Sequence, residues 1–344
     1  MNYKPQTLTM FTRLTAAAAV AISLVAFFWI RPAALADESA APAASADETK
    51  ENPSREVSQE GVPAPAALLS NVRAKLDGLD SLSCDLHETV ILSGMKFSAA
   101  GRYLQSSGNR FRLEFRIMPS TGATNSNAQP VTLDGEIPED VSKDARGSLT
   151  QVSDGSIVYS YWQNGADRKV TRRNINDILK ATADLAAYDS SRAIQDLGLG
   201  GLKTLFARIE KTMEFMPVRR ELVADRPVLV INGRWNSEIR EKLFQLPPDA
   251  EVIPQDFIPE YVRIYVDEET SLPRRIQYLK RSQDPSVKQV RPIVTMDLRQ
   301  IVLNEALDEG LFQFEAPEGV VEEDITEQTL QEIRQSGQGA PPQQ

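Results

Sequence analysis

Alternation of apolar and polar residues, the pattern of half-buried β-strands, marks the first folded part of the chain. Residues 111–117 show it most cleanly, because aromatic and aliphatic residues alternate there with charged ones. Residues 82–92 and 95–103 have the same period of two, although Glu88 interrupts the first of them. One face of each strand is therefore apolar and the other polar, as in an antiparallel sheet that is covered on one side.

Further strands are predicted without a helix between them. Residues 149–152 and 157–162 flank Asp154-Gly155, a dipeptide that favours a tight hairpin. Consecutive strands without intervening helices form a meander, which excludes the parallel sheet of nucleotide-binding folds. A second run of strands is predicted at residues 221–223, 228–235, 261–266, 274–280 and 292–302.

Three stretches have the apolar spacing of helices that pack on a sheet. The first opens at Pro65 and continues to residue 79. The second is capped by Asn174 and continues to residue 185, and the third covers residues 202–215. Residues 119–147 are rich in Pro, Gly, Asn and Asp without periodicity, and are predicted to form a long mobile loop.

The N-terminus has the features of an export signal. Residues 14–30 are an uncharged apolar run between a basic start and Ala34-Leu35-Ala36, which fits a small-x-small cleavage site. Residues 1–36 are therefore predicted to be a signal peptide, and an uncleaved membrane anchor is the alternative. Either way the remainder is expected in the periplasm, soluble after cleavage or tethered to the inner membrane by residues 14–30.

The rest of the chain divides into three parts. Residues 37–62 are Ala, Pro, Ser, Glu and Asp with almost no aliphatic content, which predicts a disordered linker. Residues 63–321 form the predicted folded domain. Residues 322–344 are acidic and then rich in Gln, Gly and Pro, which predicts a mostly disordered tail with a short helix at residues 326–333.

Charge disfavours one class of partner. The 344-residue chain has a formal charge of −10, and removal of residues 1–36 takes away three basic residues and no acid, which gives −13. An acidic surface disfavours nucleic acid and anionic lipid head groups as partners.

Catalytic and metal-binding patterns are not found. Cys84 and His87 are the only residues of their kinds, and a strand places them on opposite faces. They provide no disulfide, no Cys-His pair and no metal site. Residues 198–201, Gly-Leu-Gly-Gly, lack the full spacing of a phosphate loop. We therefore expect neither an enzyme nor a bound metal or cofactor.

Three segments carry a resemblance to a known family. They are Val152 to Tyr161, Ile264-Tyr265-Val266-Asp267 followed by Leu272-Pro273-Arg274-Arg275-Ile276, and Phe314 to Val320. Over roughly residues 68–321 the chain resembles the LolA-like periplasmic carriers, typified by the outer-membrane lipoprotein-sorting carrier. The resemblance implies an α+β fold in which a strongly curved antiparallel sheet forms an unclosed β-barrel (LolA/LolB-like) with helices covering the concave face.

The resemblance also implies a function. It predicts an extracytoplasmic, monomeric binding protein that holds a lipid, acyl chain or lipoprotein in the half-barrel, in lipoprotein sorting or envelope homeostasis. The alternative is a membrane-tethered structural or regulatory module that binds an inner-membrane or envelope protein without lipid, through its sheet edge or residues 119–147. The family's Arg-Pro pair, whose arginine helps to hold the lid, is replaced here by Ser107-Gly108, so the closing mechanism is not expected to carry over.

Bulky apolar residues on the predicted strands are the candidate ligand-binding residues of the concave face. Core packing between the sheet and its helices is the alternative for each residue taken singly. The candidates are Phe97, Tyr103, Phe111, Leu113, Phe115, Tyr159, Tyr161 and Trp235.

Overall fold

A computed structural model describes most of the predicted folded domain. The predicted signal peptide, most of the linker, residues 119–146 of the predicted loop and the last seven residues lie outside the described part. The described residues are 58–92, 95–118, 147–183, 201–223, 226–244, 246, 252–255, 257–282 and 289–337.

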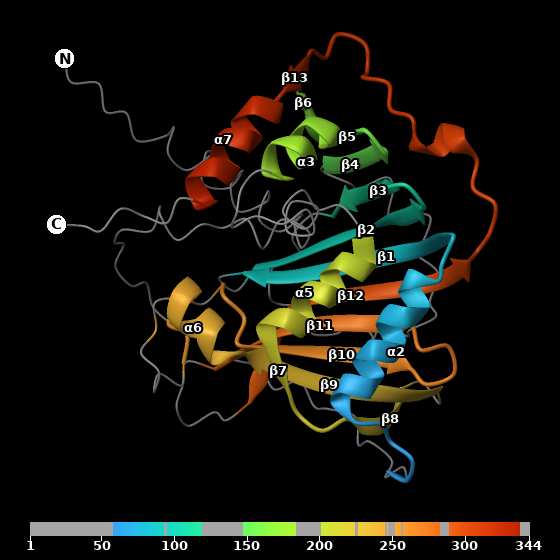
Figure 1. The fold of residues 1–344 in the computed structure, drawn as a ribbon, viewed down its shortest axis with the longest axis vertical. Coiled ribbons are helices and arrows are strands. Elements are labelled where there is room, and N and C mark those ends of the chain that lie inside the picture. Colours follow the sequence, from blue (N-terminus) through green and yellow to red (C-terminus); the bar gives the residue numbers. More distant parts are fainter. Residues whose placement is uncertain are drawn as a thin grey trace, which may run out of the picture.

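The described strands form one sheet (Figure 1). In chain order they are β1 (Ser81–Leu92), β2 (Met95–Ser106), β3 (Arg110–Ile117), β4 (Gly147–Asp154), β5 (Ile157–Asn164), β6 (Asp167–Asn174), β7 (Met213–Phe215), β8 (Arg219–Val223), β9 (Arg226–Trp235), β10 (Tyr261–Asp267), β11 (Pro273–Arg281), β12 (Val290–Leu303) and β13 (Glu322–Asp324).

The order of the strands confirms the predicted fold class. The 13-stranded sheet runs β13-β6-β5-β4-β3-β2-β1-β12-β11-β10-β9-β7, and β8 pairs with β9. Within the described residues every pairing is antiparallel except the parallel pair of β13 with β6. The terminal strands of this order, β13 and β7, are not paired with each other, so the barrel is unclosed.

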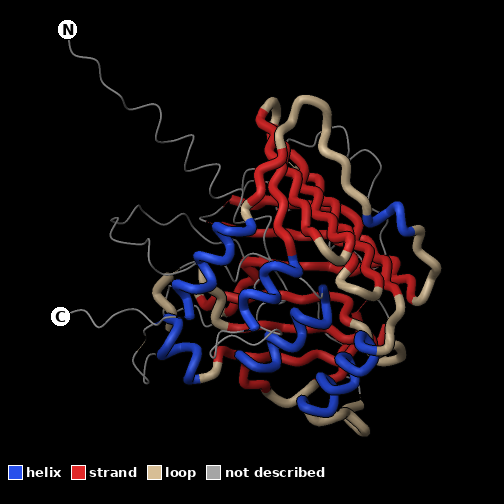
Figure 2. The backbone as a smooth tube through the Cα atoms, turned by 45° about the horizontal axis from the view of Figure 1, so that its top comes forward, coloured by secondary structure: helices blue, strands red, loops and turns tan. Residues whose placement is uncertain are grey.

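Helices cover one face of the sheet, which we call the inner face (Figures 1 and 2). The pair α2 (Pro65–Asp77) and α5 (Gly201–Thr212) lies across one part of it, and α3 (Ile175–Ala183) and α7 (Thr326–Gly337) lie together farther along. A shorter helix, α6 (Ser237–Phe244), follows β9. The buried residues of α2 and α5 pack into a single core with the inner-face residues of the strands.

The register shows which side chains share the inner face. Leu86 of β1 pairs with Gly101 of β2, and the row continues through Phe115 of β3 and Leu149 of β4 to Trp162 of β5. Because alternate residues of a strand point to opposite faces, this row assigns the face of every neighbouring position. The charged residues of β3 consequently lie on the opposite, outer face.

A segment near the C-terminus crosses the outer face. We call residues 304–325 the C-terminal strap; it contains the 3-10 helix η4 (Glu309–Phe312) and ends with β13. The Arg110 guanidinium lies 5.9 Å from the ring centroid of Phe312 and pairs with Glu309. Arg112 donates a hydrogen bond to the Leu311 carbonyl oxygen over 3.0 Å. Outer-face arginines of β3 therefore hold the strap against the sheet.

The folded part extends beyond the predicted boundary at residue 321. Leu330 and Ile333 of α7 are buried in the core, and Ile178 of α3 belongs to the same cluster. The Asn174 backbone N–H donates to the Thr326 hydroxyl, which ties the start of α7 to the end of β6. The predicted acidic tail is thus ordered up to residue 337, because one face of it is apolar enough to pack.

A close approach of β2 and β3 generates the first prediction. A Cβ atom at Gly101 would lie 1.5 Å from the backbone carbonyl oxygen of Glu114, so the strands must separate if residue 101 has a side chain. Gly101→Ala should lower the free energy of unfolding by about 2–3 kcal/mol and the melting temperature by roughly 5–8 °C. The matched control is Gly78→Ala, where the added Cβ meets ordinary contacts at 3.5 Å. Equal melting temperatures for the two variants would contradict the prediction.

Candidate functional site

Most of the predicted ligand-binding residues lie on the inner face. The register places Tyr103 opposite Cys84 and Leu113, and it places Phe97 opposite Val90. All of these residues point to the same face of the sheet as the core. The predicted residues that share this face are Phe97, Tyr103, Phe111, Leu113, Phe115 and Trp235.

Tyr103 and Trp235 have structural partners there. The Tyr103 hydroxyl donates to the Gln105 side chain over 2.8 Å and lies under the first residue of α5, where a Cβ at Gly201 would come within 1.8 Å of it. The Trp235 indole N–H donates to the Pro259 carbonyl oxygen over 2.6 Å. These two residues therefore fasten a helix and a loop to the sheet.

Tyr159 and Tyr161 are not on the inner face, so their predicted placement is wrong. Tyr159 pairs with Val152 and Tyr161 with Thr150. Both of these β4 residues pair in turn with charged, outer-face residues of β3. The Tyr159 ring stacks on Phe314 of the C-terminal strap at 5.1 Å, and Tyr161 lies 6.4 Å from the same ring. The predicted strand is present as β5, but Trp162, opposite Leu149, is the residue on the inner face.

The inner face has an incompletely buried region between α5 and α3, which we call the β2–β5 strip. Phe97, Ile117 and Trp162 are only partly buried there, whereas most of the surrounding core is fully buried. Ala99 and Gly101 lie at the β2 end of the strip, and Phe115 and Leu149, both buried, lie between Gly101 and Trp162. The strip is thus an apolar surface with small residues at its β2 end and partly exposed bulky residues around buried ones.

Glu88 is a carboxyl on this apolar face. Its side chain is 2% exposed and its Oε1 atom has no hydrogen-bond partner. The residues opposite it are Ala99 on β2 and Met296 on β12. Burial raises the pKa of Glu88 to about 8, since the charged form loses its hydration there. At neutral pH most of this carboxyl is therefore protonated and is able to donate a hydrogen bond.

Two further polar groups on the inner face are buried without a partner. They are the Tyr278 hydroxyl on β11 and the Trp162 indole N–H on β5. Burial raises the pKa of Tyr278. The charge of Arg208 lowers this pKa, and a charge on Glu88 raises it. Each buried polar group without a partner costs about 1–3 kcal/mol, so such groups are uncommon outside functional sites. They lie on either side of Glu88 in the sheet, because β5 and β11 flank β1 in the strand order.

The lone cysteine and histidine of the chain lie apart, as predicted. Cys84 is buried on the inner face, where burial raises its thiol pKa to about 12. His87 lies on the outer face opposite Asp297, and its pKa is lowered by burial and by Arg299. In the described ranges no group of side chains could hold a metal ion.

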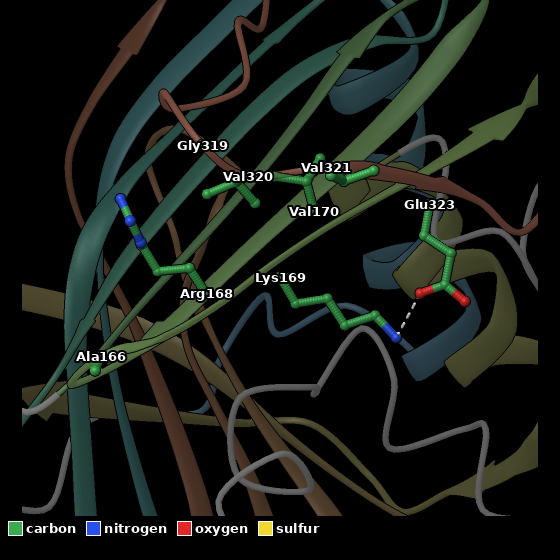
Figure 3. A pocket seen from close by; sticks show the side chains of 8 residues that line it. All are labelled: Ala166, Arg168, Lys169, Val170, Gly319, Val320, Val321 and Glu323. Carbon is green, nitrogen blue, oxygen red and sulfur yellow. Dashed lines mark ion pairs between the residues drawn. The ribbon is translucent and has the colours of Figure 1, made fainter.

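A separate surface pocket lies at the edge of the sheet (Figure 3). It has a volume of about 360 Å³ and is lined by Ala166, Arg168, Lys169, Val170, Gly319, Val320, Val321 and Glu323. An ion pair of 2.8 Å joins Lys169 of β6 to Glu323 of β13 across it. Its charged lining makes this pocket unsuitable for an apolar ligand.

Comparison with known proteins gives only distant structural matches. The sequence matches no protein-family model and has no significant match among curated proteins. Similar solved structures include a putative outer membrane lipoprotein-sorting protein domain from Vibrio parahaemolyticus, with 10% identity over 72% of this chain and 95% of that chain and a TM-score of 0.29. Mycobacterium tuberculosis lipoprotein LppX has 10% identity over 71% and 99% of the two chains and a TM-score of 0.34.

The complex of Pseudomonas aeruginosa MucA and MucB is also similar, with 11% identity over 73% of this chain and 60% of that chain and a TM-score of 0.32. At these identities and TM-scores, the matches carry no argument about a ligand or partner of this chain. The open sheet with helices on its inner face agrees with the unclosed barrel that the sequence resemblance predicts. Across the part of the chain that the structure describes, no helix combines the length and apolar character needed to cross a bilayer.

The buried carboxyl generates a prediction on stability. The pKa of Glu88 rises from 4.5 to about 8 on folding, so the native state holds this proton more tightly. The stability that the native state gains from this tighter proton binding is fully present below about pH 4.5 and is lost as the pH rises through about 8. Between about pH 5 and pH 8 the wild-type protein should lose on the order of 3 kcal/mol relative to Glu88→Gln.

Urea unfolding at several pH values measures the difference. Glu88→Leu serves as a second variant, because it removes both the charge and the polar group, and it should be the most stable of the three proteins at about pH 8. Parallel pH profiles for wild type and Glu88→Gln would show that Glu88 is hydrated in the native state.

Proposed function

We propose that the protein is an extracytoplasmic binding protein that holds an apolar ligand, namely a lipid, an acyl chain or the lipid part of a lipoprotein, against the β2–β5 strip. One observation carries the proposal. Phe97, Ile117 and Trp162 remain partly exposed on an otherwise buried apolar face, and that face also holds polar groups without partners.

The chemistry of the strip suits an acyl chain. Burial of a methylene group contributes about 0.8 kcal/mol, so a chain that covers several half-buried side chains gains a useful affinity. Ala99 and Gly101 form the β2 end of the strip, and their small side chains allow an acyl chain to lie close to the backbone of β2. A large folded partner would need a flat exposed surface, which the helices on either side do not leave.

The cellular setting rests on the N-terminal sequence. The apolar run and cleavage site of residues 1–36 support export, and the resemblance supports a role in lipoprotein sorting or envelope homeostasis. Arg110 and Arg112 follow the position where the family's carriers have their Arg-Pro pair. Both contact the C-terminal strap instead. The proposal therefore covers ligand holding and does not include the lid closure of the family's carriers.

A second candidate function, binding of an envelope protein, is favoured by the edge of the sheet. Only residues 170–172 of β6 are paired with β13. The acidic side chains of β13 form ion pairs with basic side chains of β6, namely Lys169 and Arg172. An acidic extended segment of a partner fits the remaining part of this edge. A photo-crosslinking residue in place of Ala166 should then capture such a partner in intact cells, with the same residue at Gly61 as a control.

Uptake of an acyl probe tests the proposed function. Protein purified in its native processed form and freed of lipid should bind a fluorescent fatty-acyl probe with an increase in emission. Ala99→Leu places bulk beside Phe97 and Ile117 at the β2 end of the strip and should weaken binding about tenfold, equivalent to about 1.4 kcal/mol. Arg102→Leu, on the outer face of the same strand, should bind like wild type. Absence of probe binding by the wild-type protein would contradict the proposal.

A further inference from the structure

Glu88 occupies an inner-face position of β1 that is otherwise apolar. The positions before and after it on this face are Leu86 and Val90, both buried. Its partner on β2 is Ala99, a small residue at the β2 end of the β2–β5 strip. Glu88 is 2% and Ala99 6% exposed, so the carboxyl lies within the apolar layer beside the proposed path of the ligand.

No ion pair involves the Glu88 carboxyl in the described part of the chain. The strand neighbours of Glu88 on β2 and β12 are Ala99 and Met296, and its charge acts on Tyr278 of β11, which Arg208 of α5 also affects. Burial is the cause that acts on the pKa of Glu88. The charged form is thus opposed by its surroundings, and the neutral form has a hydroxyl to donate.

We infer that Glu88 is the polar contact of the ligand site, and that its protonated carboxyl donates a hydrogen bond to a carbonyl oxygen attached to an aliphatic chain. The inference rests on the proposed function and specifies its ligand class. Fatty esters, fatty amides and protonated fatty acids all have this carbonyl, whereas a plain hydrocarbon lacks it. Ionisation of Glu88 removes the donor and places a charge beside the ligand, so binding weakens as the pH rises.

The hydrogen bond adds selectivity to a surface that otherwise recognises only hydrophobicity. An apolar ligand without an acceptor leaves the Glu88 carboxyl unpaired, which a carbonyl-bearing ligand avoids. A buried polar group discriminates between ligands more strongly than chain length does. An unmade hydrogen bond in an apolar site costs more free energy than the loss of one buried methylene group. The site should therefore prefer methyl palmitate to hexadecane.

Displacement of N-phenyl-1-naphthylamine, an apolar fluorescent probe without a carbonyl, tests the inference on the native processed protein. A carboxyl with a pKa of about 8 is only about one-tenth protonated at about pH 9, so methyl palmitate should displace the probe about tenfold less effectively there than at about pH 6.5. Hexadecane should displace it equally at both values. Circular dichroism at each pH confirms that the proteins remain folded.

Three variants separate the contribution of Glu88 from that of the fold. Glu88→Gln retains a donor and should bind methyl palmitate independently of pH. Glu88→Leu should still bind the probe but lose the preference for methyl palmitate over hexadecane. His87→Gln, the neighbouring residue on the outer face, should behave like wild type.

The outcomes distinguish this inference from the proposed function. If wild-type protein binds the probe but shows no pH dependence with methyl palmitate, or if Glu88→Leu retains the ester preference, the role of Glu88 is overturned and the apolar site stands. If wild-type protein does not bind the probe at either pH, both the site and the role of Glu88 are overturned.

Discussion

The structure depends on keeping one face of a large open sheet away from water. Alternating strands give the inner face its leucine, isoleucine and phenylalanine side chains, and each fully buried one contributes about 1.5–3 kcal/mol. Two helix pairs, α2 with α5 and α3 with α7, cover parts of this face. Between them the apolar side chains are only partly buried, as at Phe97 and Trp162. An open sheet with so few helices therefore retains apolar surface, and that surface is where the ligand is proposed to lie.

Glu88 illustrates how this face differs from a simple core. A leucine at the same position would pack beside Ala99 and Met296 without the cost of burying a carboxyl, so stability alone does not account for the glutamate. Natural proteins accept such local losses where a residue serves binding. The Tyr278 hydroxyl and the Trp162 indole N–H on the same face are also buried without a hydrogen-bond partner. Glu88 and Trp162 border the β2–β5 strip, whereas Tyr278 lies on β11, two strands beyond Glu88.

The sequence predicted the fold well where alternation was strong, and less well at the edges. The alternation of residues 111–117 identified β3 and its faces, and consecutive strands identified the meander. At the edges, β6 escaped prediction because it is mostly charged. The helix at residues 326–333 was predicted and is part of α7, but its packing was not, because Leu330 and Ile333 are its only buried apolar residues in an acidic setting. The faces of Tyr159 and Tyr161 were exchanged, since a period of two does not say which face is inner. Glu88 was visible only as an interruption, because burial without a partner is a property of the tertiary structure.

The C-terminal strap shows how the sheet can stay open and remain protected. An unpaired edge strand offers its backbone groups to other chains and promotes aggregation. At β6 the strap adds the short acidic strand β13, and Lys169 and Arg172 pair with its carboxylates. The strap reaches this edge along the outer face, where Arg110 and Phe312 hold it, and does not cross the inner face. Edge protection and the proposed ligand site are therefore on opposite faces, and the barrel does not have to close in order to be stable.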